Sequence, residues 1–162
     1  MFYERVFREL NKERAKYLVI VGIALNLHGV PRATADVDLA VEIEKKNLKK
    51  IAAVLMKIGF KPRLPVKIED FSNPQNLEKW HKAKKMVAFT FWNPKKSFEE
   101  IDILINSPIE FKDLDKAKKV IKAKDISIPI VSIDHLIKLK EMSGRKQDEA
   151  DIKALKKIKK MR

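Results

Sequence analysis

Acidic and apolar side chains alternate strictly through residues 35–42, whose sequence is ADVDLAVE. Successive side chains of a β-strand point to opposite faces. Asp36 and Asp38 therefore share one face of this strand, whereas Val37 and Leu39 share the other. The strand needs an apolar layer against one side, and it places two carboxylates about 7 Å apart on the other. This pattern predicts a β-sheet with an apolar core on one face and acidic groups on the opposite face.

A second acidic strand is predicted at residues 100–106, with the sequence EIDILIN. Its apolar face carries Ile101, Ile103 and Ile105. Asp102 lies on the opposite face, where it can join Asp36 and Asp38. Clustered carboxylates repel one another unless a cation lies between them, and such hard oxygen ligands suit Mg²⁺ or Mn²⁺. A solvated strand face is the alternative interpretation of an isolated D-x-D pair.

The remaining periodicities predict an α+β domain (α/β-like) in which helices flank a mixed β-sheet. The expected helices cover 4–16, 23–27, 45–58, 132–142 and 146–162, and the expected strands cover 17–21, 35–42, 86–92, 100–106 and 126–131. The proline-containing segment 61–85 is expected to form a loop with a short helix. We expect a single domain over 1–162, with the helices of 132–162 packing as a C-terminal extension.

Composition excludes several kinds of site. The chain has no cysteine, which rules out disulfides, thiolate zinc sites and a cysteine nucleophile, and its three histidines do not lie at metal-ligand spacing. Lys and Arg total 36 against 22 Asp and Glu, a formal net charge of +14. Such a charge favours polyanionic partners, and the alternative is the Lys- and Glu-rich surface of a thermophile protein.

No segment resembles a membrane anchor or a leader peptide. The N-terminal sequence MFYERVFREL carries charges throughout, and the longest apolar run, at 17–24, is far shorter than the roughly 20 residues needed to span a bilayer. We therefore expect a cytoplasmic protein that does not bind membranes. Gly22 ends the first strand immediately before a helix, and backbone amides at such a junction bind phosphate groups.

The segment VGIALNLHGVPRATADVDLAVE, followed by the distant acidic strand, resembles the nucleotidyltransferase superfamily. That superfamily includes DNA polymerase β, tRNA CCA-adding enzymes and aminoglycoside adenylyltransferases. The segment is most similar to the small members related to AbiEii abortive-infection toxins. The tail SIDHLIKLKEMSGRKQDEADIKAL is similar to the closing pattern of that group. The resemblance covers 17–42, 100–106 and 126–155, about half of the chain.

The resemblance implies metal-dependent transfer of a nucleoside monophosphate from an NTP, such as ATP, to a hydroxyl of an RNA, a protein or a small molecule. Asp36 and Asp38 would hold two Mg²⁺ (or Mn²⁺) ions. Asp102 would complete the metal site and orient or deprotonate the acceptor hydroxyl. These implied roles make the three aspartates both catalytic residues and metal ligands.

The resemblance also implies a set of nucleotide-binding residues. These are Gly22, Ile23, Arg32, Thr34 and Lys138. Ile23 departs from the superfamily pattern, which has a small residue directly after the glycine. An alternative function is therefore a catalytically impaired nucleotide- or RNA-binding module, as one half of a toxin–antitoxin pair. Because the chain is short, we expect a partner chain or a homo-oligomer to contribute to acceptor binding.

Overall fold

The structure is a computed structural model, and it describes residues 2–162. Eight helices and seven strands are present in this part of the chain. The helices are α1 (Phe2–Lys12), α2 (Val21–His28), α3 (Lys45–Lys57), α4 (Ile68–Phe71), α5 (Pro74–Lys84), α6 (Phe111–Lys116), α7 (Ile133–Ser143) and α8 (Asp148–Met161). The strands are β1 (Tyr17–Ile20), β2 (Val37–Val41), β3 (Lys61–Pro62), β4 (Ala88–Asn93), β5 (Lys96–Leu104), β6 (Lys119–Ala123) and β7 (Ile126–Ile130).

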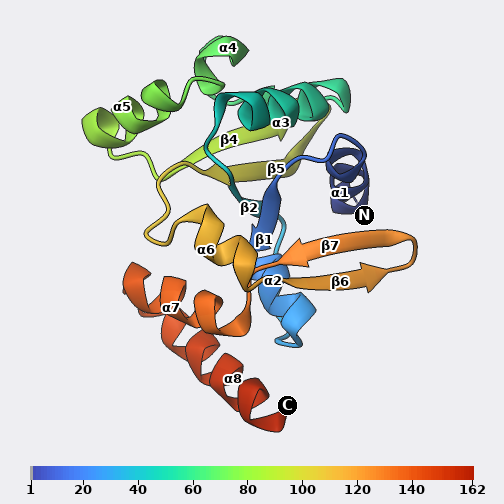
Figure 1. Cartoon of the computed structure of the whole chain (residues 1–162), viewed down its shortest axis with the longest axis vertical. Helices are drawn as coiled ribbons and strands as arrows, with labels where there is room; N and C mark the ends of the chain where they lie inside the picture. The colour runs from blue at the N-terminus through green and yellow to red at the C-terminus, as the bar shows by residue number, and fades with distance from the viewer. Residues whose placement is uncertain (1) are drawn as a thin grey trace.

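All seven strands form one mixed sheet in the order β3-β4-β5-β2-β1-β7-β6. The central strand β2 runs antiparallel to β1 and parallel to β5 (Figure 1). β1 is also parallel to β7, while β4 and β6 pair antiparallel with β5 and β7. The expected α+β class, a mixed sheet with flanking helices, is confirmed.

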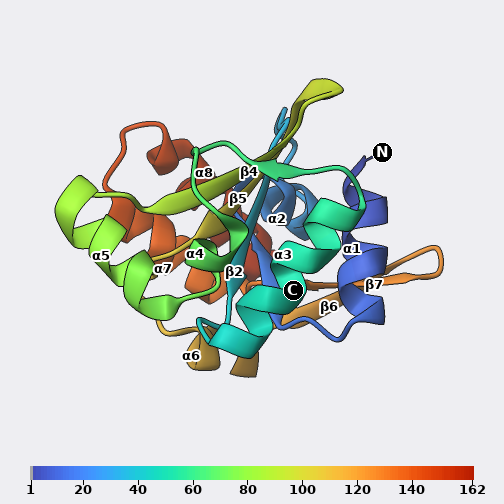
Figure 2. The same ribbon diagram turned by 90° about the horizontal axis from the view of Figure 1, so that it is seen from above.

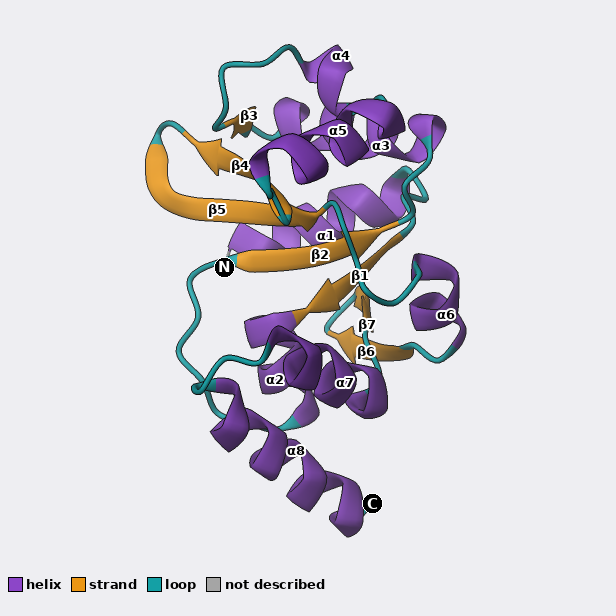
Figure 3. Ribbon diagram, turned by 90° about the vertical axis from the view of Figure 1, so that its left-hand side faces the viewer, coloured by secondary structure: helices purple, strands orange, loops and turns teal. Residues whose placement is uncertain are grey.

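The two faces of the sheet carry different helices. α3, α4 and α5 lie on one side of the sheet, and α2, α7 and α8 lie on the other (Figures 2 and 3). Val37 and Leu39 of β2 and Ile101 and Ile103 of β5 point towards the first side and are fully buried. Burying each such side chain contributes about 1.5–3 kcal/mol. The apolar face predicted by the alternation is therefore the main core.

The segment 61–85 is more regular than the sequence indicated. It contains the short β3 and two helices, α4 and α5, where a loop with one short helix was expected. Asn73 caps α5 by accepting a hydrogen bond from the backbone N–H of Gln75 at 3.0 Å, and Pro74 occupies the first turn, where its missing N–H costs nothing. The buried rings of Phe71 and Phe89 lie 4.8 Å apart and hold this segment against the sheet.

The C-terminal half also contains elements that were not expected. β6 precedes β7 and pairs with it along its whole length, so that 119–130 forms a hairpin. α7 begins as predicted, since the Ser132 side chain accepts a hydrogen bond from the backbone N–H of His135 at 3.1 Å. None of the helices within 2–162 has the length and apolar character needed to cross a bilayer.

Candidate active site

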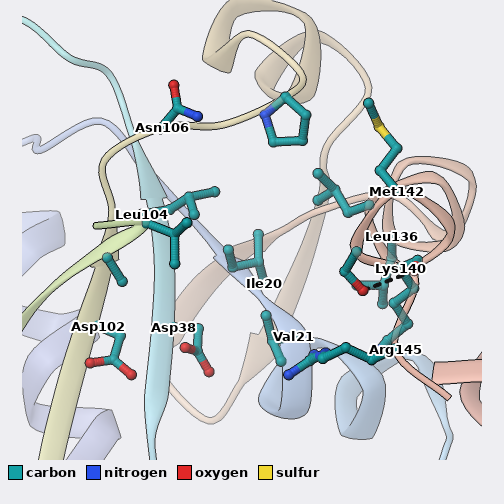
Figure 4. A pocket seen from close by; sticks show the side chains of 15 residues that line it. Ile20, Val21, Asp38, Asp102, Leu104, Asn106, Leu136, Lys140, Met142 and Arg145 are labelled. Atoms are coloured by element: carbon teal, nitrogen blue, oxygen red, sulfur yellow. Dashed lines mark hydrogen bonds between the residues drawn. The ribbon is translucent and has the colours of Figure 1, made fainter. Parts of the chain in front are cut away.

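Two of the predicted carboxylates lie side by side on neighbouring parallel strands. Asp38 of β2 and Asp102 of β5 occupy paired positions in the sheet, and both side chains line the same cavity (Figure 4). Asp36 is the residue before β2 begins, and it is half-buried. The sequence prediction that these side chains share the acidic face of the sheet thus holds for Asp38 and Asp102, with Asp36 at the edge of the strand.

A threonine that sequence analysis did not single out fixes one of the carboxylates. Thr90 of β4 is paired with Asp102 across the antiparallel β4–β5 ladder. Its hydroxyl donates to Asp102 Oδ1 at 2.6 Å. This bond to a charged acceptor is short and strong, so it restrains the carboxylate while leaving Oδ2 directed to other partners.

Burial raises the pKa values of all three carboxyl groups, and the charges of neighbouring carboxylates add to each shift. Burial, followed by the charges of Asp102 and Asp36, raises the pKa of Asp38 to about 7, although Arg145 and Lys140 partly oppose the shift. Burial is also the main cause of the raised pKa of Asp102, and Thr90 acts against it. The pKa of Asp36 is raised by burial and by the charge of Asp102. Such a group of repelling carboxylates favours the binding of a cation.

The carboxylate oxygens suit a hard divalent cation, but the protein does not supply all the ligands of its coordination shell. Across residues 2–162, no group of three or more His, Cys, Asp or Glu side chains is arranged to hold a metal ion. Mg²⁺ is commonly bound by one or two carboxylates, with substrate phosphates and water completing its shell. Asp38 and Asp102 fit that mode of binding, and Asp36 lies near enough for its charge to be felt by Asp38.

A cavity of about 610 Å³ opens above these carboxylates, between the sheet and α7. Its floor comes from β2, β4 and β5, and its opposite wall comes from Leu136, Leu139 and Lys140 of α7. Arg145, which follows α7, lies across the cavity from Asp38, beside Val21 (Figure 4). The volume lies within the range of small-molecule sites, about 300–1,000 Å³.

The turn from β1 into α2 differs from the sequence prediction. β1 ends at Ile20, and α2 already begins at Val21, so Gly22 lies inside the helix. Val21 adopts a left-handed conformation with φ of +61°, which is unfavourable for a β-branched residue. Ile23 is only 6% exposed and packs into the core. Val21 is therefore the residue with the unusual backbone conformation at this turn, where phosphate binding is expected. Ile23 does not line the cavity and so does not narrow it.

No protein-family model and no curated protein matches the chain. Solved structures do match it. The lincomycin-bound lincosamide antibiotic adenylyltransferase LnuA has a TM-score of 0.60 at 18% identity, and the match covers 97% of this chain and 94% of that one. TM1012 of Thermotoga maritima, a candidate nucleotidyltransferase, has a TM-score of 0.60 at 14% identity over 99% and 92% of the two chains. ANT(2")-Ia, in complex with adenylyl-2"-tobramycin, has a TM-score of 0.58 at 10% identity over 98% and 91%.

The chain has the nucleotidyltransferase fold. At these identities the likeness establishes the fold, and the chemistry must be argued from the residues themselves.

The sequence did not lead us to select two of the cationic side chains that line the cavity. Lys140 and Arg145 line the cavity, whereas Lys138, the lysine selected from the sequence, is exposed on α7. The signal for Lys140 was present, because it continues the buried stripe of α7 formed by Ile133 and Leu136–Ile137. A lysine on such a stripe requires buried acidic partners.

Those partners come from α8. Lys140 Nζ donates to Asp148 Oδ1 at 3.3 Å and to Asp151 Oδ2 at 3.0 Å, and all three residues are buried. Arg145 Nε donates to Asp148 Oδ2 at 3.1 Å. These contacts give Asp148 and Asp151 a structural role, because they join α7 to α8.

The predicted phosphate-binding residues of the loop before β2 lie apart from the cavity wall. Arg32 pairs with Asp151 of α8, and its backbone N–H donates to Asn26 Oδ1 at 2.9 Å. Thr34 is exposed, packs against Gly22, and donates its hydroxyl to the Asp36 backbone carbonyl at 3.3 Å. Phosphate contacts by these two residues remain predictions.

Proposed function

We propose that the protein is a metal-dependent nucleotidyltransferase that moves a nucleoside monophosphate from an NTP to a hydroxyl acceptor. The observation that carries this proposal is the pairing of Asp38 with Asp102 on parallel strands, in a cavity whose other side holds Arg145 and the start of α2. Opposite charges thus face each other across a space large enough for a nucleotide. The resemblance of the motifs further leads us to propose a relation to the small AbiEii-type members.

The roles of the residues follow from their positions. Asp38 and Asp102 would hold Mg²⁺ or Mn²⁺, which when bound stabilises the negative charge on the reacting phosphate oxygens. Arg145, whose side chain stays 55% exposed beside Asp148, and the backbone amides at the start of α2 bind the phosphates. These groups hold the α-phosphorus in line between the incoming hydroxyl and the departing pyrophosphate.

Proton transfer is assigned to Asp102. Thr90 occupies Oδ1 of this carboxylate, so Oδ2 accepts the proton of the acceptor hydroxyl. The acceptor oxygen then forms a bond to the α-phosphorus, and the bond from that phosphorus to the oxygen shared with the β-phosphate breaks, which releases pyrophosphate.

For the acceptor, we propose a hydroxyl-bearing small molecule, with RNA and protein retained as arms of the test. LnuA was solved with lincomycin, and ANT(2")-Ia was solved with adenylyl-2"-tobramycin, so nucleotidyltransferase folds of this size bind small acceptors or their adenylylated products. A catalytically impaired module is not favoured, because Ile23 leaves the cavity open.

The test is transfer from NTPs labelled at the α-phosphate, with Mg²⁺ or Mn²⁺ and with cell RNA, cell protein or a mixture of polyhydroxylated small molecules as acceptor. Asp38→Asn and Asp102→Asn should each abolish transfer. Asp113→Asn, at an exposed position of α6, is the matched control and should retain it. Equal transfer by all variants would show that the label is incorporated by a contaminant.

A further inference from the structure

The cavity is divided into two chemically different parts. Its ionic part has Asp38 and Asp102 on one side and Arg145 on the other (Figure 4). Its apolar part is a slot whose walls are formed mainly by Ala88, Leu104, Pro108, Leu136, Leu139 and Met142. Because Lys140 is bonded to α8, no free cation faces the slot from any residue that lines it.

One amide side chain lies at the end of the slot. Asn106, in the loop after β5, is separated in Figure 4 from Asp38 and Asp102 by Leu104 and Ile20. The Asn106 side chain makes no hydrogen bond to any other residue in 2–162 and is exposed to solvent. It therefore presents both a carbonyl acceptor and an NH₂ donor to whatever fills the slot.

We infer that the slot holds the base of the nucleotide and that Asn106 recognises the edge of adenine. This inference rests on the proposed function, since the phosphates are taken to occupy the ionic part. A nucleoside triphosphate has the matching division, with a polyanionic tail at one end and a flat, weakly polar ring at the other. An asparagine amide forms two hydrogen bonds with adenine, through N6–H and N7.

The chemistry of the slot discriminates among occupants. The corresponding edge of guanine carries two acceptors, O6 and N7, so the carbonyl oxygen of Asn106, placed to accept from adenine N6–H, would face an acceptor instead of a donor. A polynucleotide acceptor would need cations along its backbone, and the slot walls provide none. Apolar side chains on both sides of a flat ring suit a base, which loses little hydration when it is enclosed.

The experiment is calorimetric titration of the protein, with Mg²⁺ and without acceptor, using ATP, GTP, CTP, UTP and inorganic tripolyphosphate. ATP should bind at least tenfold more tightly than the other nucleotides. Asn106→Ala should weaken ATP binding at least fivefold and reduce the preference for ATP, while tripolyphosphate binding stays unchanged. Tripolyphosphate reports on the ionic part alone, and its binding should be lost in Asp38→Asn.

A second variant tests the slot independently of Asn106. Ala88→Leu places a larger side chain on the cavity floor and so narrows the slot. It should weaken the binding of all four nucleotides and leave tripolyphosphate binding unchanged. Ala83→Leu, at an exposed position of α5, is the matched control and should change none of the affinities. The melting temperature of each variant verifies that it is folded.

The outcomes separate the two proposals. Equal affinities for all four nucleotides, with no effect of Asn106→Ala or Ala88→Leu, would overturn the base-site inference while tripolyphosphate binding still supports the proposed function. Absence of binding by every nucleotide and by tripolyphosphate would overturn both. A preference for ATP that disappears in Asn106→Ala would establish the inference.

Discussion

Gly22 lies so close to Thr34 that a Cβ atom on Gly22 would stand 2.7 Å from Thr34 Oγ1 and 2.9 Å from Thr34 Cβ. This contact joins the start of α2, where Val21 lines the cavity, to the loop that enters β2. A side chain at residue 22 would force these two segments apart. Glycine is therefore required here because a side chain would collide with Thr34. The backbone conformation does not require it, since Gly22 is not among the residues with positive φ.

Gly22→Ala should destabilise the protein by about 1–3 kcal/mol, the usual cost of overpacking. Denaturation in urea measures the change. The double variant Gly22→Ala, Thr34→Gly should recover most of the loss, because it removes the atoms that the new methyl group meets. Additive losses in the double variant would contradict the proposed contact.

Val21→Gly should keep or increase stability, whereas Ile23→Ala should reduce it. Val21 is held in the left-handed region, at a cost of about 1–2 kcal/mol that glycine does not incur, while Ile23 is buried and its truncation costs about 2–5 kcal/mol. Thermal unfolding of the two variants distinguishes them. Titration with an NTP and Mg²⁺ should show affinity nearly unchanged in Ile23→Ala, and a large gain there would show that Ile23 blocks the phosphates after all.

Asp38→Asn should stabilise the metal-free protein in a pH-dependent way. The pKa of Asp38 is raised to about 7 in the folded state, so the folded protein binds this proton more tightly than the unfolded chain does. The wild-type protein therefore loses stability as the pH rises from about 4 through 7. One pKa unit corresponds to about 1.4 kcal/mol, so the free energy of unfolding of Asp38→Asn should exceed that of the wild type by as much as about 4 kcal/mol at pH 8.

The measurement for Asp38 is urea denaturation in EDTA at pH values from 5 to 8. Asp113→Asn serves as the reference, because Asp113 is exposed. A difference between Asp38→Asn and wild type that stays constant over this range would contradict the raised pKa. Repeating the series with Mg²⁺ and an NTP should reverse the order, because only the wild-type carboxylate gains from the bound cation.

Lys140→Met should cost about 3–5 kcal/mol of stability, because it removes the buried cation that both carboxylates share and leaves each with a partly exposed arginine. Lys138→Met provides a closely matched control two residues away. Its side chain is exposed, so it should change stability by no more than about 0.5 kcal/mol. Chemical denaturation at pH 7 compares the two variants, and equal effects would refute the buried cluster.

Local patterns predicted the strands and their faces well. The alternation around Asp38 determined which side chains enter the core, because a one-residue shift would turn every apolar group of the strand towards solvent. The number of residues over which each strand pairs with its neighbours could not be inferred in the same way. β1 ends at Ile20, which pairs with Asp38, and the pairs with β5 begin at Val37, so Asp36 lies beyond both ladders. This is why Asp36 sits outside β2, although it shares the expected alternation.

The long-range contacts were the part that sequence did not reveal. The choice between Lys138 and Lys140 depends on which side of α7 is covered by α8, and that packing brings together residues from separate helices. The hairpin of β6 and β7 was missed for a related reason. The sequence KVIKA of β6 is rich in lysine and weakly apolar, and it becomes a strand because β7 offers a free edge for pairing.

The buried cluster of Lys140, Asp148 and Asp151 has a consequence for the order in which the protein matures. The carboxylates on β2 and β5 are synthesised early, but the wall opposite them is α7, and α7 contains a lysine that is neutralised only by α8. A nascent chain that has not yet extruded α8 from the ribosome therefore carries an unpaired charge in its unfinished wall. The wall formed by α7 is therefore complete only when α8 packs against it, however early the acidic strands are folded.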